Sequence, residues 1–535
     1  MIIDELKYKI LQQFGFPPTQ EQAHALEVFA EFLTDRDPHA VMILRGSAGT
    51  GKTTLSGAIV RTLKEIRQKV MLLAPTGRAA KVFSLNSGSP AYTIHRRIYR
   101  EKSFSGVEGQ FNLNDNLYTD TLFMVDEASM IANMGLGGMS FGSGCLLDDL
   151  VHFVYQGRND RLLLIGDKAQ LPPVGEEESP ALHAAMLEGY GLKVYECDLN
   201  EVLRQSEESG ILYNATMIRQ MITHDDITQL PKIHFAGYSD IKPMPGAELI
   251  EALADSYHHV GLDDTIVVTR SNKRANIFNQ GIRNMVLDRE EELSQGDILM
   301  IVKNNYYWME EERKKLSEER RVKSEETAFG GRRESQFNSL ANLKVPSSNL
   351  QVQSNHTVQS SKFQVQSNQV QSNEIPAFLA NGDRAKVLKV RRRIDLYGFR
   401  FATLLLQFPD YDNYELEATV LLDTLTSEAP ALTHEQQEQL FYQIEEDYQD
   451  IPLKADRMKV IRQDQFFNAL QVKFAYAVTC HKAQGGQWAH VYVDQGYMTD
   501  DMLNPDYIHW LYTAFTRATE MLYLVNWPET QTVQC

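Results

Sequence analysis

The stretch GSAGTGKTT, residues 46–54, constrains the fold more than any other part of this sequence. A short apolar run, AVMILRG, precedes it, and LSGAIVRTLKEI, which has apolar residues at helical spacing, follows it. The local order is therefore strand, glycine-rich loop and helix. Such a loop turns its backbone N–H groups inward around an anion, and the positive end of the following helix points at the same place.

This loop predicts a site for the phosphates of ATP. Lys52 is expected to reach the β- and γ-phosphates, and the Thr53 hydroxyl is expected to hold Mg²⁺. The alternative is a glycine-rich turn between a strand and a helix that binds nothing. The residues predicted to contact the nucleotide are Gly46, Ser47, Ala48, Gly49, Thr50, Gly51, Lys52, Thr53 and Thr54.

Length and composition indicate a large globular chain. Its 535 residues leave room for three or four domains, and 43% hydrophobic and 23% charged residues are typical of a soluble protein. No apolar run reaches the length of a membrane span, and the N-terminal stretch lacks the basic start and apolar middle of a signal peptide. We therefore expect a cytoplasmic protein that makes no membrane contact.

Charge and cysteine content argue against other classes. A net charge of −18 argues against general polyanion binding over the whole surface, because such binding rests on Lys and Arg at phosphates. It leaves room for a local basic or hydrogen-bonding cleft. The four cysteines are far apart and form no C-x-x-C pair, so neither a zinc site nor a disulfide framework is predicted.

Two series of continuous apolar runs, separated by helical patterns, predict parallel strands that are covered on both faces. The first series comprises residues 41–45, 70–74, 121–125 and 161–165. The second series comprises residues 265–269, 474–478, 490–494 and 521–525. The predicted fold class is α/β, with two domains of similar kind and a long insertion in the second.

The insertion contains further strand-like segments with turn signals between them. These segments, whose spacing suits a small β-barrel, are residues 296–304, 382–394, 399–408 and 414–422. The acidic stretch 433–450 that follows predicts a surface helix with a solvated face.

Residues 309–375 differ in composition from the rest of the chain. Their first part is highly charged and predicts a helix held by pairs such as Glu310 with Lys314. Their second part is rich in Gln, Ser and Asn and contains QVQSN three times. It lacks the apolar content that would offset its ordering entropy, which predicts a disordered loop. A partner-binding or β-aggregating segment is the alternative.

Acidic and amide side chains follow two strands of the first series. Asp126 and Glu127 directly follow the run 121–125. They are therefore expected at the carboxyl end of a parallel strand, where such sheets bind ligands. Asp126 is expected to complete the Mg²⁺ shell, and Glu127 to polarise the water that attacks the γ-phosphate. Gln170, in LIGDKAQLPPVG, is placed to sense that phosphate; a simple turn fixed by the two prolines is the alternative.

The order of these motifs resembles that of superfamily 1 helicases, and specifically of their RecD-like and Dda-like 5′-to-3′ branch. The segments that carry the resemblance are TQEQ (19–22), GSAGTGKT, LLAPTGRAAKVF (72–83), TIHRRIY (93–99), VDEAS, LIGDKAQLPPVG, VLRQ (202–205), VVTRSNKRAN (267–276), YAVTCHKAQGGQW (476–488) and LYTAFTRA (511–518).

The resemblance implies two RecA-like domains with parallel sheets that face each other across one ATP, so that ATP binding closes the cleft and hydrolysis opens it. Gln22 would read the adenine edge, and Gly486 would lie at the nucleotide. Lys52 and Gln170 would act on the phosphates from the first domain. Arg204 and Arg517 would be arginine fingers from the second domain; a surface ion pair is the alternative for each.

The resemblance also implies domain boundaries. The first RecA-like domain would span residues 1–195, with an inserted hairpin at about 99–118. The second RecA-like domain would comprise residues 196–295 and 460–535, and an SH3-like barrel inserted in it would comprise residues 296–308 and 376–459. The low-complexity insert would span residues 309–375.

Several family motifs are rich in small hydroxylic and imidazole groups, which suit hydrogen bonds to the phosphates of a single strand. The residues assigned to this contact are Pro75, Thr76, Thr93, His95, Thr479 and His481. Purely structural roles are the alternative for each. In the family the hairpin carries a pin that splits the duplex, with Phe104 or Phe111 as its stacking tip; a plain surface hairpin would have the same sequence. The glycines of 131–144 imply a mobile loop.

The function that the resemblance implies is an ATP-dependent DNA helicase, acting in repair, recombination or replication. It would translocate 5′ to 3′ on single-stranded DNA and act at single-strand/duplex junctions as a monomer, with repair or replication proteins as candidate partners. One alternative is a nucleic-acid-dependent ATPase switch that does not unwind. Another is an RNA helicase, because phosphate contacts discriminate poorly between DNA and RNA. The polarity comes from the resemblance alone.

Overall fold

The computed structural model describes residues 2–104, 109–135, 142–201, 208–224, 228–318 and 378–533. The chain forms two compact units, Met1–Asn304 with Ala380–Cys535 and Asn305–Leu379. The larger unit contains two parallel sheets and a closed barrel. In the smaller unit residues 307–318 are helical, and Lys314 donates to Glu311 at 2.8 Å, one residue away from the predicted partner Glu310. The Gln/Ser/Asn-rich part of the insert lies outside the described residues.

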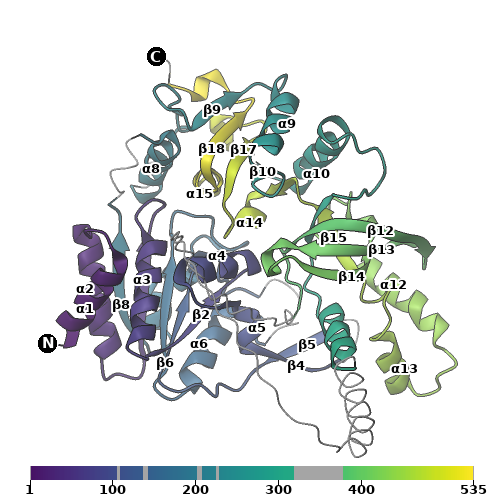
Figure 1. The fold of residues 1–535 in the computed structure, drawn as a ribbon, viewed down its shortest axis with the longest axis horizontal. Coiled ribbons are helices and arrows are strands. Elements are labelled where there is room, and N and C mark those ends of the chain that lie inside the picture. The colour runs from purple at the N-terminus through teal and green to yellow at the C-terminus, as the bar shows by residue number, and fades with distance from the viewer. Residues whose placement is uncertain are drawn as a thin grey trace, which may run out of the picture. The chain divides into compact units, whose positions relative to one another are not determined.

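The first sheet has six parallel strands in the order β3-β2-β6-β7-β1-β8. Figure 1 labels β2, β6 and β8 of this sheet. Its strands are β1 (Ala40–Gly46), β2 (Lys69–Ala74), β3 (Ala91–Thr93), β6 (Thr121–Val125), β7 (Arg161–Gly166) and β8 (Lys193–Leu199). Every residue of β1, β6 and β7 is buried, as continuous apolar runs require. The structure therefore confirms the four strands predicted for this sheet.

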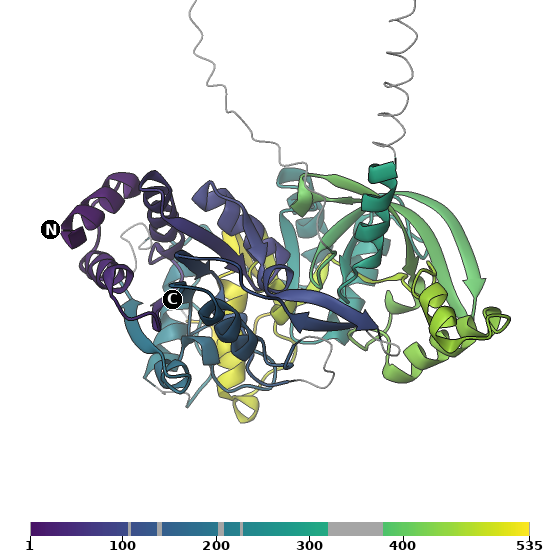
Figure 2. The ribbon, with the colours of Figure 1, turned by 90° about the horizontal axis from the view of Figure 1, so that it is seen from below.

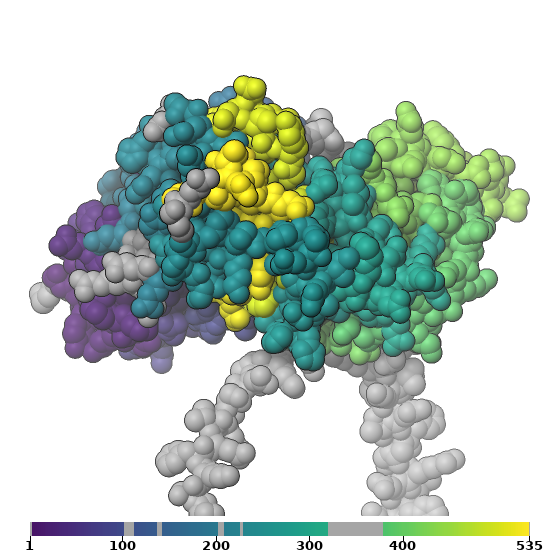
Figure 3. All heavy atoms as spheres, turned by 90° about the horizontal axis from the view of Figure 1, so that it is seen from above, coloured from purple at the N-terminus to yellow at the C-terminus, as the bar shows by residue number. Residues whose placement is uncertain are grey.

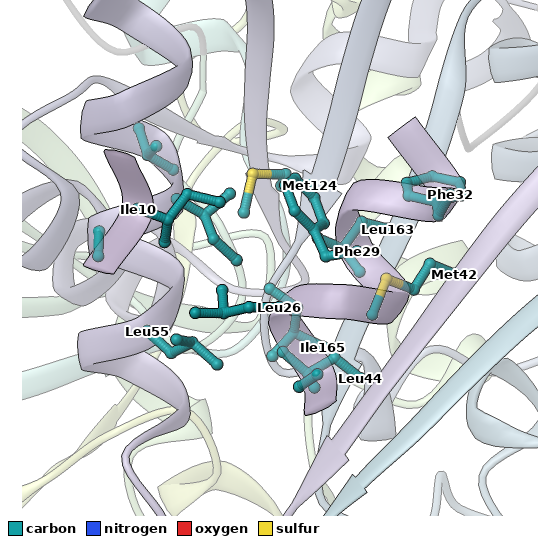
Figure 4. Packing of buried hydrophobic residues seen from close by; sticks show 14 of the residues in the cluster. Ile10, Leu26, Phe29, Phe32, Met42, Leu44, Leu55, Met124, Leu163 and Ile165 are labelled. Carbon is teal, nitrogen blue, oxygen red and sulfur yellow. The ribbon is translucent and has the colours of Figure 1, made fainter. Parts of the chain in front are cut away.

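Helices cover both faces of this sheet. They are α1 (Ile2–Phe14), α2 (Gln20–Thr34), α3 (Lys52–Glu65), α4 (Gly77–Ser87), α5 (Ile94–Ile98), α6 (Leu146–Gln156) and α7 (Ala184–Glu188). Alternate residues of each strand point to opposite faces, so Met42 and Leu44 pack with α1, α2 and α3, whereas Val41 and Ile43 pack with α5 and α6. Figure 4 shows the first of these two cores, in which Phe29 and Leu26 of α2 lie over the sheet.

The second sheet has five parallel strands in the order β16-β10-β17-β18-β9. The strands are β9 (Ile241–Met244), β10 (Thr265–Thr269), β16 (Ala477–Thr479), β17 (Trp488–Asp494) and β18 (Ala518–Val525). The surrounding helices are α8 (Gly210–Thr223), α9 (Leu249–His259), α10 (Asn272–Gly281), α14 (Cys480–Ala483) and α15 (Pro505–Phe515). Figure 3 shows residues from the teal and the yellow parts of the chain side by side, since β9 pairs with β18.

The barrel closes in the order β11-β12-β13-β14-β15. Its strands are β11 (Ile298–Ile301), β12 (Arg384–Leu396), β13 (Phe399–Phe408), β14 (Tyr414–Leu421) and β15 (Leu470–Phe474). Figure 2 shows the long, curved green strands of this barrel. The structure confirms the small barrel inserted in the second α/β domain, in which four strand-like segments were predicted.

The fifth barrel strand corrects the prediction for residues 474–478. One strand of the second sheet was expected there, and 460–535 was assigned to that domain, but Phe474 ends β15 in the barrel and Ala477 begins β16. The side chain of Asn279 occupies the break. Its Nδ2 donates to the carbonyls of Phe474 at 3.2 Å and Ala477 at 2.9 Å, and its Oδ1 accepts from the amides of Tyr476 and Ala477.

Two smaller predictions concern the hairpin and the acidic helix. β4 (Tyr99–Phe104) and β5 (Gly109–Leu113) pair as an antiparallel hairpin, which confirms the insert in the first domain. The acidic stretch forms α12 (His434–Asp447), followed by α13 (Lys454–Ile461). Its expected solvated face is only part of the helix, because Leu440, Phe441 and Ile444 are buried in a cluster with residues of β13.

Across the described residues, every helix is too short or too polar to traverse a lipid bilayer.

Candidate nucleotide and nucleic-acid site

The glycine-rich loop joins β1 to α3 at the carboxyl end of the sheet. Gly51 adopts a left-handed conformation with φ of 82° directly before the first helical residue, Lys52. A Cβ on Gly46 would lie 2.8 Å from Lys52 Cγ and 3.0 Å from Leu199 Cβ, so only glycine fits there. The backbone geometry is that of a phosphate-binding loop at a helix N-terminus.

Lys52 lies inside this loop. Its Nζ donates to the carbonyl oxygen of Ser47 at 2.9 Å and also to that of Gly46. The hydroxyl of Thr53 is exposed at the start of α3, where a metal ion could reach it. These positions are compatible with the predicted contacts of Lys52 to a nucleotide and of Thr53 to its Mg²⁺, and both contacts stay predictions.

Gln22 connects the start of α2 to the loop. It is buried, its Nε2 donates to the Thr50 carbonyl at 2.9 Å, and its Oε1 accepts from the Thr19 amide at 3.0 Å in a capping box. These contacts make Gln22 a support for the loop. Its predicted reading of the adenine edge remains a prediction.

The two acids lie at the end of β6, beside Lys52. Burial and the neighbouring Glu127 carboxylate raise the pKa of Asp126 to about 7, while the Lys52 ammonium acts in the opposite direction. Glu127 has a φ of 53°, a left-handed conformation that is unfavourable for a residue with a side chain. A bound cation would relieve the cost of ionising Asp126, so the acid pair fits a metal site.

Gln170 follows β7 on the same edge of the sheet. It is buried, and its Oε1 has no hydrogen-bond partner within the described residues. A buried acceptor without a partner carries a desolvation cost, which a hydrogen-bond donor such as the attacking water would remove. This orphaned oxygen fits a group that acts on a bound ligand.

Arg517 lies directly after α15, in the second domain. The residue is 3% exposed, and within the part of the chain that the structure describes its guanidinium forms no ion pair. Its hydrogen bonds go to neutral oxygens of Thr513, Gly486 and Thr516. A buried cation without a carboxylate is suited to an anionic ligand, because the phosphate would supply the missing charge.

The second domain holds the loop that carries Gln170. The Leu171 amide donates to Thr513 Oγ1 at 2.7 Å, and the Leu171 carbonyl accepts from Gln484 Nε2 at 2.7 Å. His509 of α15 bonds the Ala169 carbonyl at 2.9 Å. Three side chains of the second domain therefore bind the backbone beside Gln170.

Two further residues of the second domain reach the phosphate-binding loop. Arg219 of α8 donates to the Ser47 hydroxyl, and to the Asn200 carbonyl at 3.4 Å. The hydroxyl of Tyr512 accepts from the Ala48 amide at 2.9 Å. The sequence analysis missed both residues. Tyr512 stands in the motif LYTAFTRA, which was used only for Arg517, whereas Arg219 lies in a helix with no quoted motif.

The predicted DNA contacts in the first domain lie at the ends of neighbouring strands. Thr76 follows β2 and Thr93 ends β3, and each caps a helix by accepting a backbone N–H, from Ala79 at 3.2 Å and from Arg96 at 3.4 Å. Each hydroxyl keeps its hydrogen for another acceptor. Burial lowers the pKa of His95 to about 4, so its ring is neutral at pH 7.

The predicted DNA contacts in the second domain lie at a similar edge. Thr479 ends β16, beside Thr269 of β10, and His481 is exposed in α14. A Cβ on Gly485 would lie 3.1 Å from Thr76 Oγ1, so the two motifs adjoin. Arg78 strengthens this junction by stacking on Trp488, with its Cζ 4.2 Å from the ring centroid.

Some predicted residues lie outside the described residues. These are Arg204, the turn of the hairpin with the side chains of Phe104 and Phe111, and residues 136–141 of the glycine-containing loop. Pro75 lies between β2 and the cap residue Thr76.

Two protein families match this chain. Residues 18–230 match the AAA domain family, and residues 474–525 match the UvrD-like helicase C-terminal domain. The chain has the two-domain motif set of the RecD-like and Dda-like superfamily 1 helicases. The first match covers the phosphate-binding loop and both acids, and the second covers Gly486 and Arg517.

Curated relatives support the same group. The ATP-dependent RecD2 DNA helicase of Deinococcus radiodurans is 32% identical over 157 residues, which cover 29% of this chain and 18% of that protein. The ATP-dependent DNA helicase Dda of Enterobacteria phage T4 is 24% identical over 302 residues, which cover 53% of this chain and 60% of that protein. An uncharacterized protein of Methanocaldococcus jannaschii, MJ1519, is 34% identical over 168 residues, 29% of this chain and 13% of that protein. The matches thus span less than two thirds of each relative's own length.

Solved structures of Pif1 helicases are also similar to this chain. A Bacteroides Pif1 helicase in complex with ADP-AlF3 and ssDNA has a TM-score of 0.41 at 13% identity, covering 97% of this chain and 95% of that one. The Candida albicans Pif1 helicase has a TM-score of 0.41 at 14% identity, covering 97% of both chains.

The raised pKa of Asp126 predicts how Asp126→Asn changes stability. The folded protein binds this proton more tightly than the unfolded chain does, so the free energy of unfolding falls as the pH rises from 3.8 to about 7. In Asp126→Asn the side chain does not ionise, so the variant does not lose this part of the free energy of unfolding as the pH rises. Thermal unfolding in a chelator should therefore show a Tm advantage for Asp126→Asn that grows over this interval and is constant above it.

Asp501→Asn, which changes an exposed aspartate, is the matched control and should show no such advantage. A Tm difference between Asp126→Asn and the parent that does not vary with pH would contradict the assigned cost of ionisation.

The contact between Arg219 and Ser47 predicts a loss of nucleotide affinity in Arg219→Ala. Removing a charged hydrogen-bond donor from the phosphate site should raise the dissociation constant for ATP about tenfold. Equilibrium titration with a fluorescent ATP analogue would measure it. Arg61→Ala removes an arginine of α3 that also donates to backbone carbonyls, and it should bind ATP normally. Equal affinities of the two variants would show that Arg219 does not act on the nucleotide.

Proposed function

We propose that this chain is an ATP-dependent DNA helicase that translocates 5′ to 3′ along single-stranded DNA and displaces the complementary strand. The observation that carries the proposal is the reach of second-domain side chains to the phosphate-binding loop and to the loop of Gln170. Because both domains contribute to one nucleotide site, ATP binding and hydrolysis can change how the domains sit against each other. Such a change is what a motor on a strand requires.

Each residue has a chemical role in this proposal. Lys52 and the loop amides would bind the phosphates, and Thr53 and Asp126 would hold Mg²⁺, which would supply positive charge to the phosphate oxygens. Glu127 accepts a proton from the attacking water, which Gln170 orients. Arg517 stabilises the charge that develops on the transferred phosphoryl group, and Arg204 is assigned the same role by its motif.

The strand would lie along the edge formed by the ends of β2, β3 and β16. Thr76, Thr93 and Thr479 stand at this edge and could donate hydrogen bonds to phosphate oxygens without reading sequence. Hydroxyl and amide donors need no basic surface, which is compatible with a net charge of −18. DNA as the substrate follows from the relatives, RecD2 and Dda, which are named DNA helicases. The direction follows from the resemblance to their branch.

Strand displacement from tailed duplexes tests the function directly. Two DNA duplexes that differ only in carrying a 5′ or a 3′ single-stranded tail are mixed with the protein, ATP and Mg²⁺. We expect displacement from the 5′ tail alone, because a 5′-to-3′ motor loaded there runs into the duplex. Lys52→Ala should abolish both ATP hydrolysis and displacement, since the phosphates lose their charged donor.

Lys64→Ala, in the last turn of the same helix, is the matched control and should remain active. Displacement from the 3′ tail alone would support a motor that translocates 3′ to 5′, and would contradict the proposed direction. DNA-stimulated ATP hydrolysis without displacement from either tail would favour the ATPase switch, and displacement from tailed RNA alone would favour an RNA helicase.

The position of Arg517 predicts a defect in chemistry with binding retained. Loss of an arginine finger lowers kcat by about 1000-fold or more, so Arg517→Ala should bind ATP and turn it over very slowly. Steady-state hydrolysis and ATP titration measure the two effects. Arg517→Lys keeps the charge but loses the planar fork, and we expect it to be nearly as slow. An unchanged kcat in Arg517→Ala would remove the finger role.

A further inference from the structure

Tyr512 is a buried tyrosine of α15 whose hydroxyl joins three parts of the nucleotide site. Its oxygen accepts from the Ala48 amide at 2.9 Å and donates to Asp167 Oδ2 at 2.7 Å. Only 1% of the side chain is exposed. One hydroxyl of the second domain therefore bridges the phosphate-binding loop and the loop that follows β7 in the first domain.

The surroundings of Tyr512 keep its hydroxyl in the donor form. Burial and the Asp167 carboxylate raise the pKa of Tyr512 well above its ordinary value, while the charge of Arg219 opposes this rise. The Asp167 carboxylate in turn accepts from the Ala169 amide at 3.0 Å, which shapes the turn leading to Gln170. A movement of the tyrosine would thus act on the turn beside Gln170.

The same helix leads to Arg517. Thr513 is the neighbour of Tyr512 and accepts two hydrogen bonds. Its carbonyl oxygen accepts from Arg517 Nε at 3.0 Å, and its hydroxyl oxygen accepts from the Leu171 amide at 2.7 Å. Arg517 follows α15 by two residues. A displacement of α15 at Tyr512 is therefore transmitted to the predicted arginine finger through one turn of helix.

We propose that Tyr512 is a positioning residue that couples nucleotide binding in the phosphate-binding loop to the placement of α15 and Arg517. This inference rests on the ATP binding and hydrolysis of the proposed function, and not on DNA unwinding. The motif LYTAFTRA predicted a role for Arg517 but none for Tyr512.

The coupling has a simple physical basis. A ligand shifts a conformational equilibrium only when its interaction free energy differs between the two states. The Ala48 amide has one hydrogen to donate, and the hydroxyl oxygen of Tyr512 accepts this hydrogen bond. A phosphate oxygen that takes this hydrogen breaks the bond between the Ala48 amide and Tyr512. The hydroxyl then keeps its bond to Asp167 alone, so the position of α15 against the phosphate-binding loop can change.

Tyr512→Phe removes the hydroxyl and keeps the ring. Nucleotide no longer has to displace the tyrosine, so the dissociation constant for ADP and ATP should fall by about threefold. Arg517 loses its placement, so kcat with single-stranded DNA should fall by about tenfold or more. A residue with a purely structural role would instead weaken nucleotide binding and lower Tm together.

Tyr507→Phe is the matched control. Tyr507 is a second buried tyrosine of α15, and its hydroxyl donates to Gln495, within the second domain. This variant should keep the parental nucleotide affinity and kcat. Tyr512→Phe and Tyr507→Phe with the same affinity and the same kcat would overturn the proposal.

A double-mutant cycle locates the link. Asp167→Asn weakens the acceptor of the Tyr512 hydroxyl, so if the direct bond carries the effect, adding Tyr512→Phe to Asp167→Asn should cause little further loss of kcat. Losses of kcat that multiply would overturn the direct link. A parent protein that hydrolyses ATP but displaces no strand would contradict the helicase function alone, because nucleotide affinity and kcat still report on Tyr512.

Discussion

Two hydrogen bonds to the backbone of Leu171 hold the first α/β domain against the second. The amide donates to Thr513 and the carbonyl accepts from Gln484, each at 2.7 Å and both buried. Buried backbone groups must find partners, so this loop can keep its shape only while the second domain supplies them. The position of Gln170, one residue earlier, depends on the same contacts. The candidate nucleotide site and the placement of the two domains therefore depend on the same hydrogen bonds.

Most central strands of both sheets were predictable, because burial on both faces leaves a local mark in the sequence, whereas β3, β8 and β9 were not among the predicted runs. Residues 162–165 of β7 are continuously apolar for that reason, and the structure places this strand in the middle of the first sheet. The run 474–478 is equally apolar, yet the chain passes there from the barrel to the second sheet. The side chain of Asn279 bonds the backbone on both sides of the break between the two strands, and Asn279 is 195 residues away from Phe474 in the sequence. A local pattern contains no signal for a partner at that distance.

The same distinction applies to the candidate site. Lys52 and Asp126 belong to short motifs whose chemistry depends on their immediate neighbours, so the sequence indicates both. Arg219 and Tyr512 contact the phosphate-binding loop from a different domain, 172 and 464 residues away from Ser47 and Ala48 respectively. Only Tyr512 stood in a recognised motif. Contacts of this kind follow from how two separately folded domains meet, which periodicity and spacing do not encode.

Among the residues that the structure describes, buried polar groups at the candidate nucleotide site lack the partners that a buried charge elsewhere in the fold has. Arg283 is a buried arginine of the second domain that pairs with buried Asp297 at 3.1 Å, so its charge is compensated within the fold. Arg517 is as deeply buried but bonds only neutral oxygens. Burial raises the free-energy cost of ionising Asp126. The buried Oε1 of Gln170 has no hydrogen-bond partner within the described residues. A bound nucleotide with its metal would relieve all three costs at once, because it brings both the anion and the cation that these side chains lack.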